Sequence, residues 1–240
     1  MAAGKYWQIR HLEIKLRIRN QKLPQINPKG LFLATCNLLL ITWISFVHSQ
    51  EVTTQNRLEQ FLAGLETFNA GFEQTLFNEF GEELETSTGS VYLMRPGKFH
   101  WVYSEPYTQF LISNGINLWI YDADLEQVTI NNIGDSIEKS PASILTGDVN
   151  INEQYIVTEL GNNEGTDWIE LASRVVESQY NAINLGFRGD DVSEMVMADN
   201  LGQTTRIVFA DVKRNIPLAN TLFEFTPPEG VDILDSREHP

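Results

Sequence analysis

Hydrophobic positions follow a helical period only in a short stretch after residue 57. Apolar residues recur there at positions i, i+3, i+4 and i+7, the spacing that forms one stripe along a helix. The members of this stripe are Leu58, Phe61, Leu62 and Leu65. Thr53 or Thr54 is available to cap the start of the helix. The pattern therefore predicts one amphipathic helix at the beginning of the folded part of the chain.

Beyond this helix the hydrophobic period changes to two, which is typical of strands with one buried face. Alternating or apolar runs predict strands at residues 68–72, 91–94, 99–103, 109–113, 116–121, 155–160, 168–171, 182–187, 194–197 and 205–209. Asn114-Gly115 separates two of these runs and is a strong hairpin signal. The acidic stretch 78–88 shows no such alternation, and we predict a loop there.

A second, shorter helix is predicted in the middle of the chain. Ser140 offers an N-cap, Pro141 suits the first helical position, and Gly147 suits the C-terminal end. Many antiparallel strands with these two helices indicate an α+β fold in a single domain. A large sheet has to close on itself or cover one face, and two helices provide only partial cover. We therefore expect a curved sheet whose concave apolar face forms a pocket under a helical lid.

The segment before the first helix has the three parts of a secretory signal peptide. Residues 1–30 contain seven basic residues and one acidic residue, and residues 31–47 carry no charge. Val47-His48-Ser49 then ends in a small residue before Gln50. We expect cleavage after Ser49, which makes residues 1–49 a signal peptide with a long basic leader and residues 50–240 the mature domain. A retained membrane anchor is the alternative, because the uncharged run is near the lower length limit for a span.

Composition changes the picture in two ways once residues 1–49 are set aside. The single cysteine, Cys36, is removed, so an exported mature chain would rely on its core rather than on disulfides. Seven of the 17 basic residues are removed but only one of the 32 acidic residues, which leaves a mature net charge of −21. That charge argues against nucleic acid and anionic membrane surfaces as partners. The signal peptide therefore indicates export to an oxidising compartment.

The mature sequence offers little catalytic chemistry. His100 and His239 are its two histidines, and no nucleophile motif, glycine-rich phosphate loop or paired metal-ligand spacing is present. His100 alternates with Phe99 and Trp101, which predicts that it faces solvent. Nothing assembles a nucleophile, a base and an oxyanion site. We therefore expect no enzyme, no cofactor and no metal.

One cation lies among aromatic residues. Arg95 occupies the turn between the expected strands 91–94 and 99–103. It is either an ordinary surface arginine on a hairpin, or a donor whose five N–H groups grip the exposed carbonyls of a helix end.

Three segments in the same order carry a resemblance to a known family. They are Arg95-Pro96-Gly97-Lys98-Phe99-His100-Trp101, Phe110-Leu111-Ile112-Ser113-Asn114-Gly115 leading to Leu118-Trp119-Ile120-Tyr121, and Phe223-Glu224-Phe225-Thr226-Pro227-Pro228-Glu229-Gly230-Val231. Together they resemble the outer-membrane lipoprotein carrier family, LolA, over essentially all of the mature chain. The resemblance implies an incomplete, unclosed antiparallel β-barrel with a helical lid over a hydrophobic cavity.

The resemblance also implies a function and its residues. The expected location is the periplasm. The expected cargo is acylated lipoproteins, which are released by an inner-membrane ABC-type complex, carried across the periplasm and handed to an outer-membrane receptor lipoprotein. Arg95 matches the arginine that latches the lid, with partners expected at Leu62, Leu145 and Thr146. The expected cavity residues are Phe72, Phe99, Trp101, Trp119 and Ile144.

Other classes of protein are weighed against this one. A lipoprotein receptor of similar fold would need a lipidated cysteine at its mature N-terminus, and a membrane-stress sensor would need a second domain. An enzyme acting on lipid is disfavoured by the motif search. A carrier of another lipid, of glycolipid or wax type, stays open.

Overall fold

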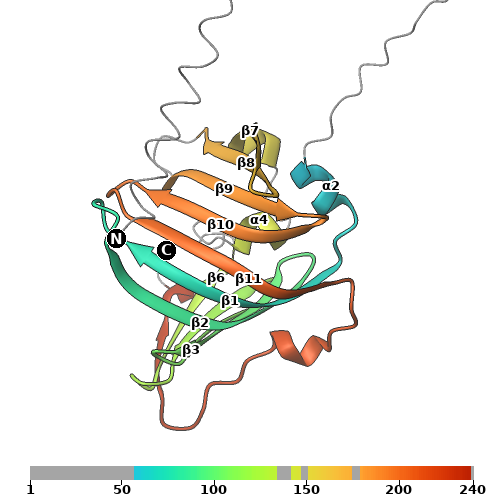
Figure 1. Cartoon of the computed structure of the whole chain (residues 1–240). Coiled ribbons are helices and arrows are strands. Elements are labelled where there is room, and N and C mark those ends of the chain that lie inside the picture. The colour runs from blue at the N-terminus through green and yellow to red at the C-terminus, as the bar shows by residue number, and fades with distance from the viewer. Residues whose placement is uncertain (1–56, 134–141, 147–150, 175–178, 239–240) are drawn as a thin grey trace, which may run out of the picture. The chain divides into compact units, whose positions relative to one another are not determined.

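The computed structural model describes residues 57–133, 142–146, 151–174 and 179–238 (Figure 1). All of them belong to one compact unit, Gln55–Pro240. The predicted signal peptide, residues 1–49, lies outside the described residues. The helices are α2 (Arg57–Ala63), α4 (Ala142–Thr146) and α5 (Ile151–Gln154), and η1 (Asn220–Phe223) and η2 (Ser236–Glu238) are 3-10 turns. The strands are β1 (Thr67–Phe77), β2 (Glu83–Met94), β3 (Lys98–Glu105), β4 (Gln109–Asn114), β5 (Asn117–Asp122), β6 (Gln127–Asn132), β7 (Tyr155–Asn163), β8 (Thr166–Ser173), β9 (Tyr180–Arg188), β10 (Asp191–Asp199), β11 (Thr204–Arg214) and β12 (Asp232–Asp235).

Across the described residues the twelve strands form one sheet, in the order β12-β6-β5-β4-β3-β2-β1-β11-β10-β9-β8-β7. Two antiparallel meanders, β1 to β6 and β7 to β11, are joined where β1 pairs with β11. The sheet curves but does not close, and β7 and β12 are its edges (Figure 1). The predicted incomplete antiparallel barrel is thus confirmed. The one parallel pairing among these strands is that of β12 with β6.

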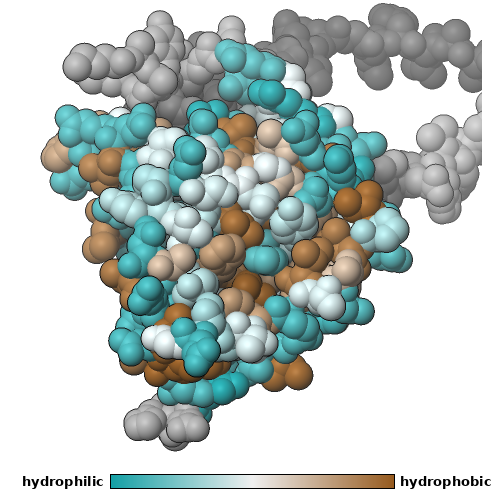
Figure 2. Space-filling view, turned by 90° about the horizontal axis from the view of Figure 1, so that it is seen from below, coloured by the Kyte–Doolittle hydropathy of each residue, from teal (hydrophilic) through white to brown (hydrophobic). Residues whose placement is uncertain are grey.

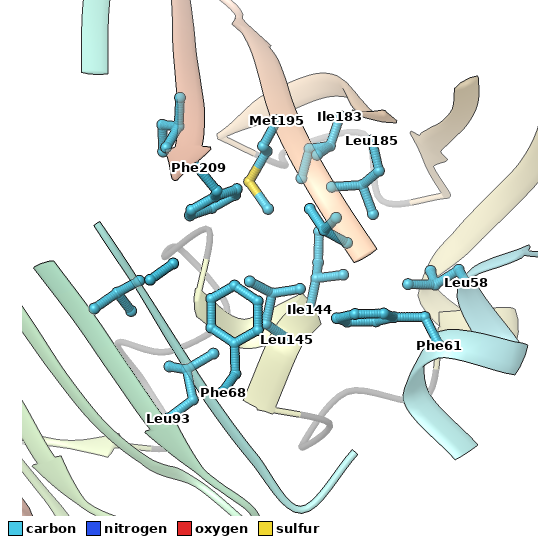
Figure 3. Close-up of a cluster of buried hydrophobic side chains, with 14 of the residues drawn as sticks. Leu58, Phe61, Phe68, Leu93, Ile144, Leu145, Ile183, Leu185, Met195 and Phe209 are labelled. Atoms are coloured by element: carbon cyan, nitrogen blue, oxygen red, sulfur yellow. The ribbon is translucent and has the colours of Figure 1, made fainter. Parts of the chain in front are cut away.

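The two faces of the sheet carry separate apolar clusters. The larger cluster includes residues of α2, α4 and most strands, and we call the face that bears it the inner face. Figure 3 shows side chains of both helices pointing into the space between the two meanders. The labelled residues are Leu58 and Phe61 of α2, Ile144 and Leu145 of α4, and the strand residues Phe68, Leu93, Ile183, Leu185, Met195 and Phe209. The helices therefore cover the inner face with fully buried side chains.

The smaller cluster lies on the opposite, outer face. It consists of Ile112, Trp119, Val128 and Ile130, with Phe225 and Val231 of the C-terminal segment packed against it. That segment contains η1 and continues into β12. Because it covers the outer face of β3 to β6, these strands are apolar on both faces.

The prediction that His100 faces solvent is wrong, because the same C-terminal segment lies next to it on the outer face. The imidazole is half-buried between the rings of Tyr92 and Phe110, at 6.1 Å from each ring centroid. Burial lowers the pKa of His100 below 6.5, and the nearby backbone of Leu222 in η1 partly offsets this effect.

The close contact of β2 with its neighbours depends on a glycine. A Cβ added to Gly89 would lie 1.8 Å from the carbonyl oxygen of Val102 and 2.8 Å from the ring of Phe72. The pairing of β2 with β3 also shifts by one residue between Thr88 and Gly89, which is a β-bulge. Any larger residue at position 89 would push these strands apart.

The predicted helices and strands are largely confirmed, with one error and three omissions. Residues 78–88 are not all loop, because β2 begins at Glu83 and pairs with the end of β1. The sequence patterns did not predict β6, β12 or α5. The first helix is confirmed as α2, although it ends at Ala63, before the last residue of the apolar stripe. The second is confirmed as α4, while Thr53, Thr54, Ser140, Pro141 and Gly147 lie outside the described residues.

Within the described part of the chain, no helix combines the length and the apolar character needed to span a membrane. Seen from below, the molecule shows apolar side chains in several patches between hydrophilic ones (Figure 2). Phe80 and Leu201, each 79% exposed, lie at two adjacent turns, since a Cβ on Gly202 would contact Glu79. Exposed apolar side chains of this kind are common on protein surfaces.

Candidate functional site

Arg95 joins the two helices that cover the inner face. It follows β2 directly, and its backbone N–H donates to the carbonyl of Glu66 at 2.9 Å. Its Nη1 donates to the carbonyl oxygens of Leu62 at 2.5 Å and Leu65 at 3.4 Å, and its Nε donates to that of Thr146 at 3.2 Å. Leu62 lies in the last turn of α2, Leu65 follows just after the end of that helix, and Thr146 is the last residue of α4. A single guanidinium therefore holds both helix ends.

This geometry follows from the chemistry of helix ends. The last carbonyl groups of a helix have no partner within the helix, and a guanidinium supplies several donors in one plane. Its positive charge also suits the C-terminal end of a helix. Two of the expected partners, Leu62 and Thr146, accept its hydrogen bonds. Leu65 is an additional acceptor, and Leu145 contributes a fully buried side chain to the core beside this contact.

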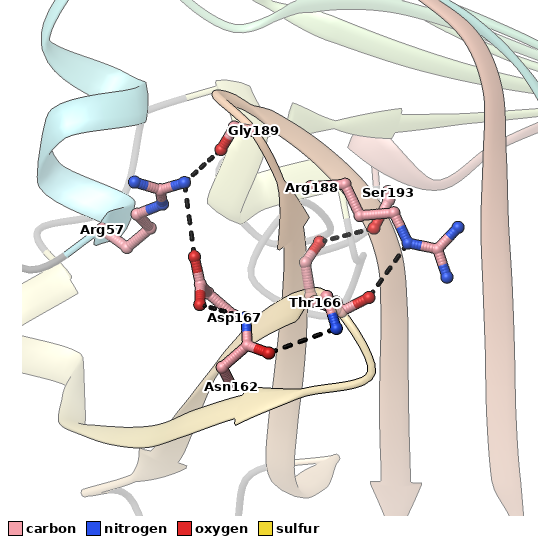
Figure 4. A network of polar contacts seen from close by, with 9 residues as sticks. Arg57, Asn162, Thr166, Asp167, Arg188, Gly189 and Ser193 are labelled. Atoms are coloured by element: carbon pink, nitrogen blue, oxygen red, sulfur yellow. Dashed lines mark hydrogen bonds and ion pairs between the residues drawn. The ribbon is translucent and has the colours of Figure 1, made fainter.

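A second arginine fastens the other end of α2 (Figure 4). Arg57 Nη2 donates to the carbonyl oxygen of Gly189, in the turn between β9 and β10. The same nitrogen lies 3.5 Å from Oδ2 of Asp167 on β8. Asn162 holds this carboxylate from β7, since its Nδ2 donates to Asp167 Oδ1 at 2.7 Å. The start of α2 is thereby attached to the β7–β10 half of the sheet.

The last residue of β11 and the residue after it attach the C-terminal end of α2 to the sheet. Asn215 Nδ2 donates to the carbonyl of Gly64 at 2.7 Å, and its Oδ1 accepts from the backbone N–H of Glu66 at 2.9 Å. The guanidinium of Arg214 lies over the ring of Phe61, 5.5 Å from its centroid. These contacts attach α2 to the sheet, whereas Arg95 attaches α2 to α4.

Four of the five expected cavity residues come together on the inner face. Phe72, Phe99, Trp101 and Ile144 all belong to the inner cluster, and Phe72 lies 5.0 Å from Trp101 between ring centroids. Trp119 does not join them. It belongs to the outer cluster and lies 6.4 Å from the ring of Phe225, so its assignment to the cavity is corrected.

The inner face becomes polar toward the far end of β3. A pocket of about 290 Å³ is lined there by Gln74, Glu85, Ser87, Tyr103, Pro106, Tyr107, Gln109 and Asp122. The Tyr103 hydroxyl donates to Oε1 of Gln74 at 3.1 Å. Burial raises the pKa of Tyr103 to about 12, so this hydroxyl keeps its proton at any physiological pH. The inner face thus has an apolar part under the helices and a polar pocket beyond Trp101.

Sequence reasoning missed several residues that hold the lid. Arg57, Arg214 and Asn215 lie in polar positions at element ends, where no hydrophobic period marks them. A weak signal exists for Asn215, because asparagine tolerates the left-handed conformation it adopts, with a φ of 56°. Their contacts join residues more than 100 positions apart in the sequence, as for Arg57 with Asp167 and Gly189. Only the folded sheet brings these residues together.

The apolar inner face can bind an apolar ligand, and the helices that hydrogen bonds hold in place can cover that face. In the described ranges, no group of three or more His, Cys, Asp and Glu residues is placed to hold a metal ion. An open antiparallel sheet with an apolar inner face under short helices defines the class of half-barrels with a helical lid.

Comparison with known proteins identifies the family within this class. The chain belongs to the outer membrane lipoprotein carrier protein family, LolA, whose family model matches residues 63–226. An outer-membrane lipoprotein carrier protein of Methylococcus capsulatus is 39% identical over 200 residues, which cover 83% of this chain and 96% of the relative. One of Chromobacterium violaceum is 36% identical over 178 residues, 74% of this chain and 85% of the relative. The resemblance seen in the sequence is thereby confirmed.

A solved structure supports the fold alone. An uncharacterized conserved protein from Thermus thermophilus matches with a TM-score of 0.51 and 14% identity, over 76% of this chain and 98% of that chain. At this low identity the likeness concerns the arrangement of the backbone and carries no functional argument.

Proposed function

We propose that the chain is a periplasmic carrier that holds the acyl chains of lipoproteins on its inner face while they pass between two membranes. The observation that carries the proposal is the apolar inner face under two helices that Arg95 joins. Membership of the lipoprotein carrier family, with relatives of that name over most of the chain, supports it. The proposed mature protein is residues 50–240, after removal of the signal peptide.

The physical need for such a carrier follows from the cost of exposing acyl chains to water. Burial of each methylene contributes about 0.8 kcal/mol, so one chain of about 16 carbons costs roughly 12 kcal/mol when it is hydrated. A carrier has to supply apolar surface for the chains. In its empty state it also has to hide that surface, and the side chains of α2 and α4 do so here.

The hydrogen bonds of Arg95 to the ends of the two helices, which we call the latch, set the balance between the empty and the loaded state of the protein. Hydrogen bonds from a charged donor contribute about 1.5–3 kcal/mol each, so the contacts of Arg95 are small against the burial of acyl chains. Cargo can therefore displace the helices, and closure of the helices favours release. No step of this cycle needs covalent chemistry, and the proposed protein is a chaperone rather than an enzyme.

The proposed route has two partners. An inner-membrane ABC-type complex loads the cargo, and an outer-membrane receptor lipoprotein takes it over. The direction of transfer comes from an affinity for the cargo that increases along the route. The carrier itself only shifts between states that differ by a few kcal/mol. The acidic mature surface suits a protein that must not adsorb to anionic headgroups.

The proposal is tested by competition for the inner face. The purified mature protein should bind an apolar fluorescent probe saturably, and an acylated lipoprotein should displace the probe. The same lipoprotein without its acyl chains is the control and should displace none. If the folded protein binds no probe, the inner face is plain core and the proposal fails.

The alternative cargo, a glycolipid or wax-type lipid, can be distinguished from lipoproteins by identifying the material that co-purifies with the protein. Mass analysis of material extracted from the periplasm with the wild type and with Arg95→Leu identifies the lipid class. Recovery of triacylated lipoproteins supports the proposal. Recovery of a different lipid as the main component would assign the same fold to that lipid.

A further inference from the structure

The inner face contains a buried hydrogen-bond donor without an acceptor. The side chain of Trp101 is only 4% exposed, and its Nε1–H has no partner among the described residues. Its ring lies against Phe72 and, at 6.4 Å between centroids, against Phe209. A buried indole N–H nearly always finds an acceptor, because leaving it unpaired costs free energy. Phenylalanine would fill such a place without that cost.

Trp101 lies at the border between the apolar and the polar part of the inner face. On β3, Phe99 is fully buried toward the helices, and Tyr103 lines the polar pocket. On β1, Phe72 packs on Trp101, while Gln74, two residues further on, lines the pocket and accepts from Tyr103. Trp101 therefore belongs to the last apolar row before the pocket begins.

We propose that the Trp101 N–H donates a hydrogen bond to an acyl carbonyl oxygen of the bound lipid. This inference rests on the proposed function and adds an orientation to it. The carbonyl of an ester or amide linkage is the acceptor that every acyl chain carries, and it lies at the polar end of the chain. A donor at the border fixes that linkage beside the pocket, and the chains then extend under α2 and α4.

The pocket beyond Trp101 takes the polar group to which the acyl chains are attached. It presents the side chains of Gln74 and Gln109, the Tyr103 hydroxyl and the carboxylates of Glu85 and Asp122. These groups can pair with the amides of a polypeptide that leaves the inner face at this end. Tyr107, 64% exposed, marks the side of the pocket that is open to solvent. A chain entering with its carbonyl at the opposite end would leave both the indole N–H and the linkage unpaired.

The test removes the hydrogen bond from each side in turn. Trp101 is replaced by 3-benzothienylalanine, which keeps the shape of the indole but has sulfur in place of the N–H. Ligand binding is measured with a dipalmitoyl lipopeptide and with its dihexadecyl ether counterpart, which lacks the two acyl carbonyls. The wild type should bind the ester about five- to tenfold more tightly than the ether, the ratio that one neutral hydrogen bond supplies. The variant should bind both ligands equally.

Two controls make the result specific to this indole. The same replacement at Trp119, on the outer face, should leave the preference for the ester unchanged. The indole N–H resonance of Trp101, assigned with Trp101→Phe, should move downfield on addition of the ester and not of the ether. Equal binding of both ligands by the wild type overturns the inference and leaves the carrier function intact. Binding of neither ligand by the folded protein overturns the proposed function as well.

Discussion

Gly89 shows how a missing side chain shapes the inner face at the scale of one residue. Gly89→Ala places a methyl group against the Val102 carbonyl and the ring of Phe72, neither of which can move freely in the sheet. We expect the free energy of unfolding to fall by about 1–3 kcal/mol, as for other overpacked sites. Urea unfolding measures the change.

Gly71 provides the matched control for this substitution. It also lies inside a strand, but the nearest atom to an added Cβ is 3.8 Å away, which is an ordinary contact. Gly71→Ala should change the stability by no more than about 0.5 kcal/mol. Similar losses at both positions would mean that the close approach at Gly89 is not the cause.

His100 gives the protein a predictable dependence of stability on pH. Its pKa is lowered in the folded state, so the unfolded chain binds the proton more readily as the pH falls through 6.5. The His100 contribution to stability is therefore complete above pH 6.5 and decreases below it. His100→Phe keeps a ring between Tyr92 and Phe110, and it should lose less stability than the wild type from about pH 7.5 to about pH 5. Parallel pH profiles for the two proteins would contradict this.

The position of a single residue could be predicted from the sequence where alternation along a strand assigns it to one face of the sheet. Phe99 and Trp101 were assigned to the inner face from alternation and resemblance, and the structure brings them together there. Trp119 and His100 were not placed correctly, because alternation separates two faces without telling which one is covered. On β5, Leu118 and Trp119 are both buried, each on a different face. The covering segment lies about 100 residues away in the sequence, and no local pattern reveals it.

At the scale of elements, α2 is attached at both ends, and Arg57 holds its start. Arg57→Gln removes the ion pair with Asp167 and weakens the bond to the Gly189 carbonyl. Both charged side chains are about a third or more exposed, so we expect an effect below about 1 kcal/mol. Hydrogen exchange of the α2 amides should speed up about two- to fivefold.

Arg206→Gln is the control for this experiment. It breaks an ion pair of similar kind, with Glu194, between β10 and β11. The exchange of α2 should not respond to it. Equal acceleration in both variants would attribute the effect to general loss of charge pairing rather than to the attachment of the helix.

Most elements were predictable because burial and turn chemistry agree along the chain. The exception at residues 78–88 has a physical reason. The first residues of β2, from Glu83 to Thr86, are exposed on both faces, so no apolar alternation marks them. Backbone pairing with β1, such as Leu76 with Glu85, holds them in the sheet. The parallel pairing of β12 with β6 is likewise a long-range contact without a local signal.

For the whole molecule, the signal-peptide pattern predicts where the mature chain begins. We expect the exported protein to begin at Gln50, because the basic, apolar and small-residue succession ends at Ser49. N-terminal sequencing of the periplasmic fraction measures this directly. An uncleaved protein in the membrane fraction would favour the retained anchor instead.

The antiparallel half-barrel and its lid could be anticipated from the strand pattern and the family resemblance together. The path of the chain through the sheet could not, since β1 pairs with β11 across more than 100 residues. The attachments of the lid depend on this pairing, because Asn215 and Thr67 meet at its end. Sequence therefore indicated the class of site, and the tertiary contacts determine how the site is held closed.

We propose that Arg95 stabilises the closed, empty state of the protein against the loaded one. Arg95→Leu removes the hydrogen bonds to Leu62, Leu65 and Thr146 and keeps an apolar side chain that can still pack. The variant should accept cargo as well as the wild type or better, because loading no longer has to break these bonds. It should deliver cargo more slowly, because closure no longer favours release.

A two-step transfer assay measures both effects in one experiment, with loading from inner-membrane vesicles followed by delivery to purified receptor lipoprotein. Arg206→Leu serves as the control for loss of an arginine elsewhere on the sheet and should leave both steps unchanged. For Arg95→Leu we predict retained or increased loading together with reduced delivery. Equal loss in both steps, or no loss in either, would contradict the latch.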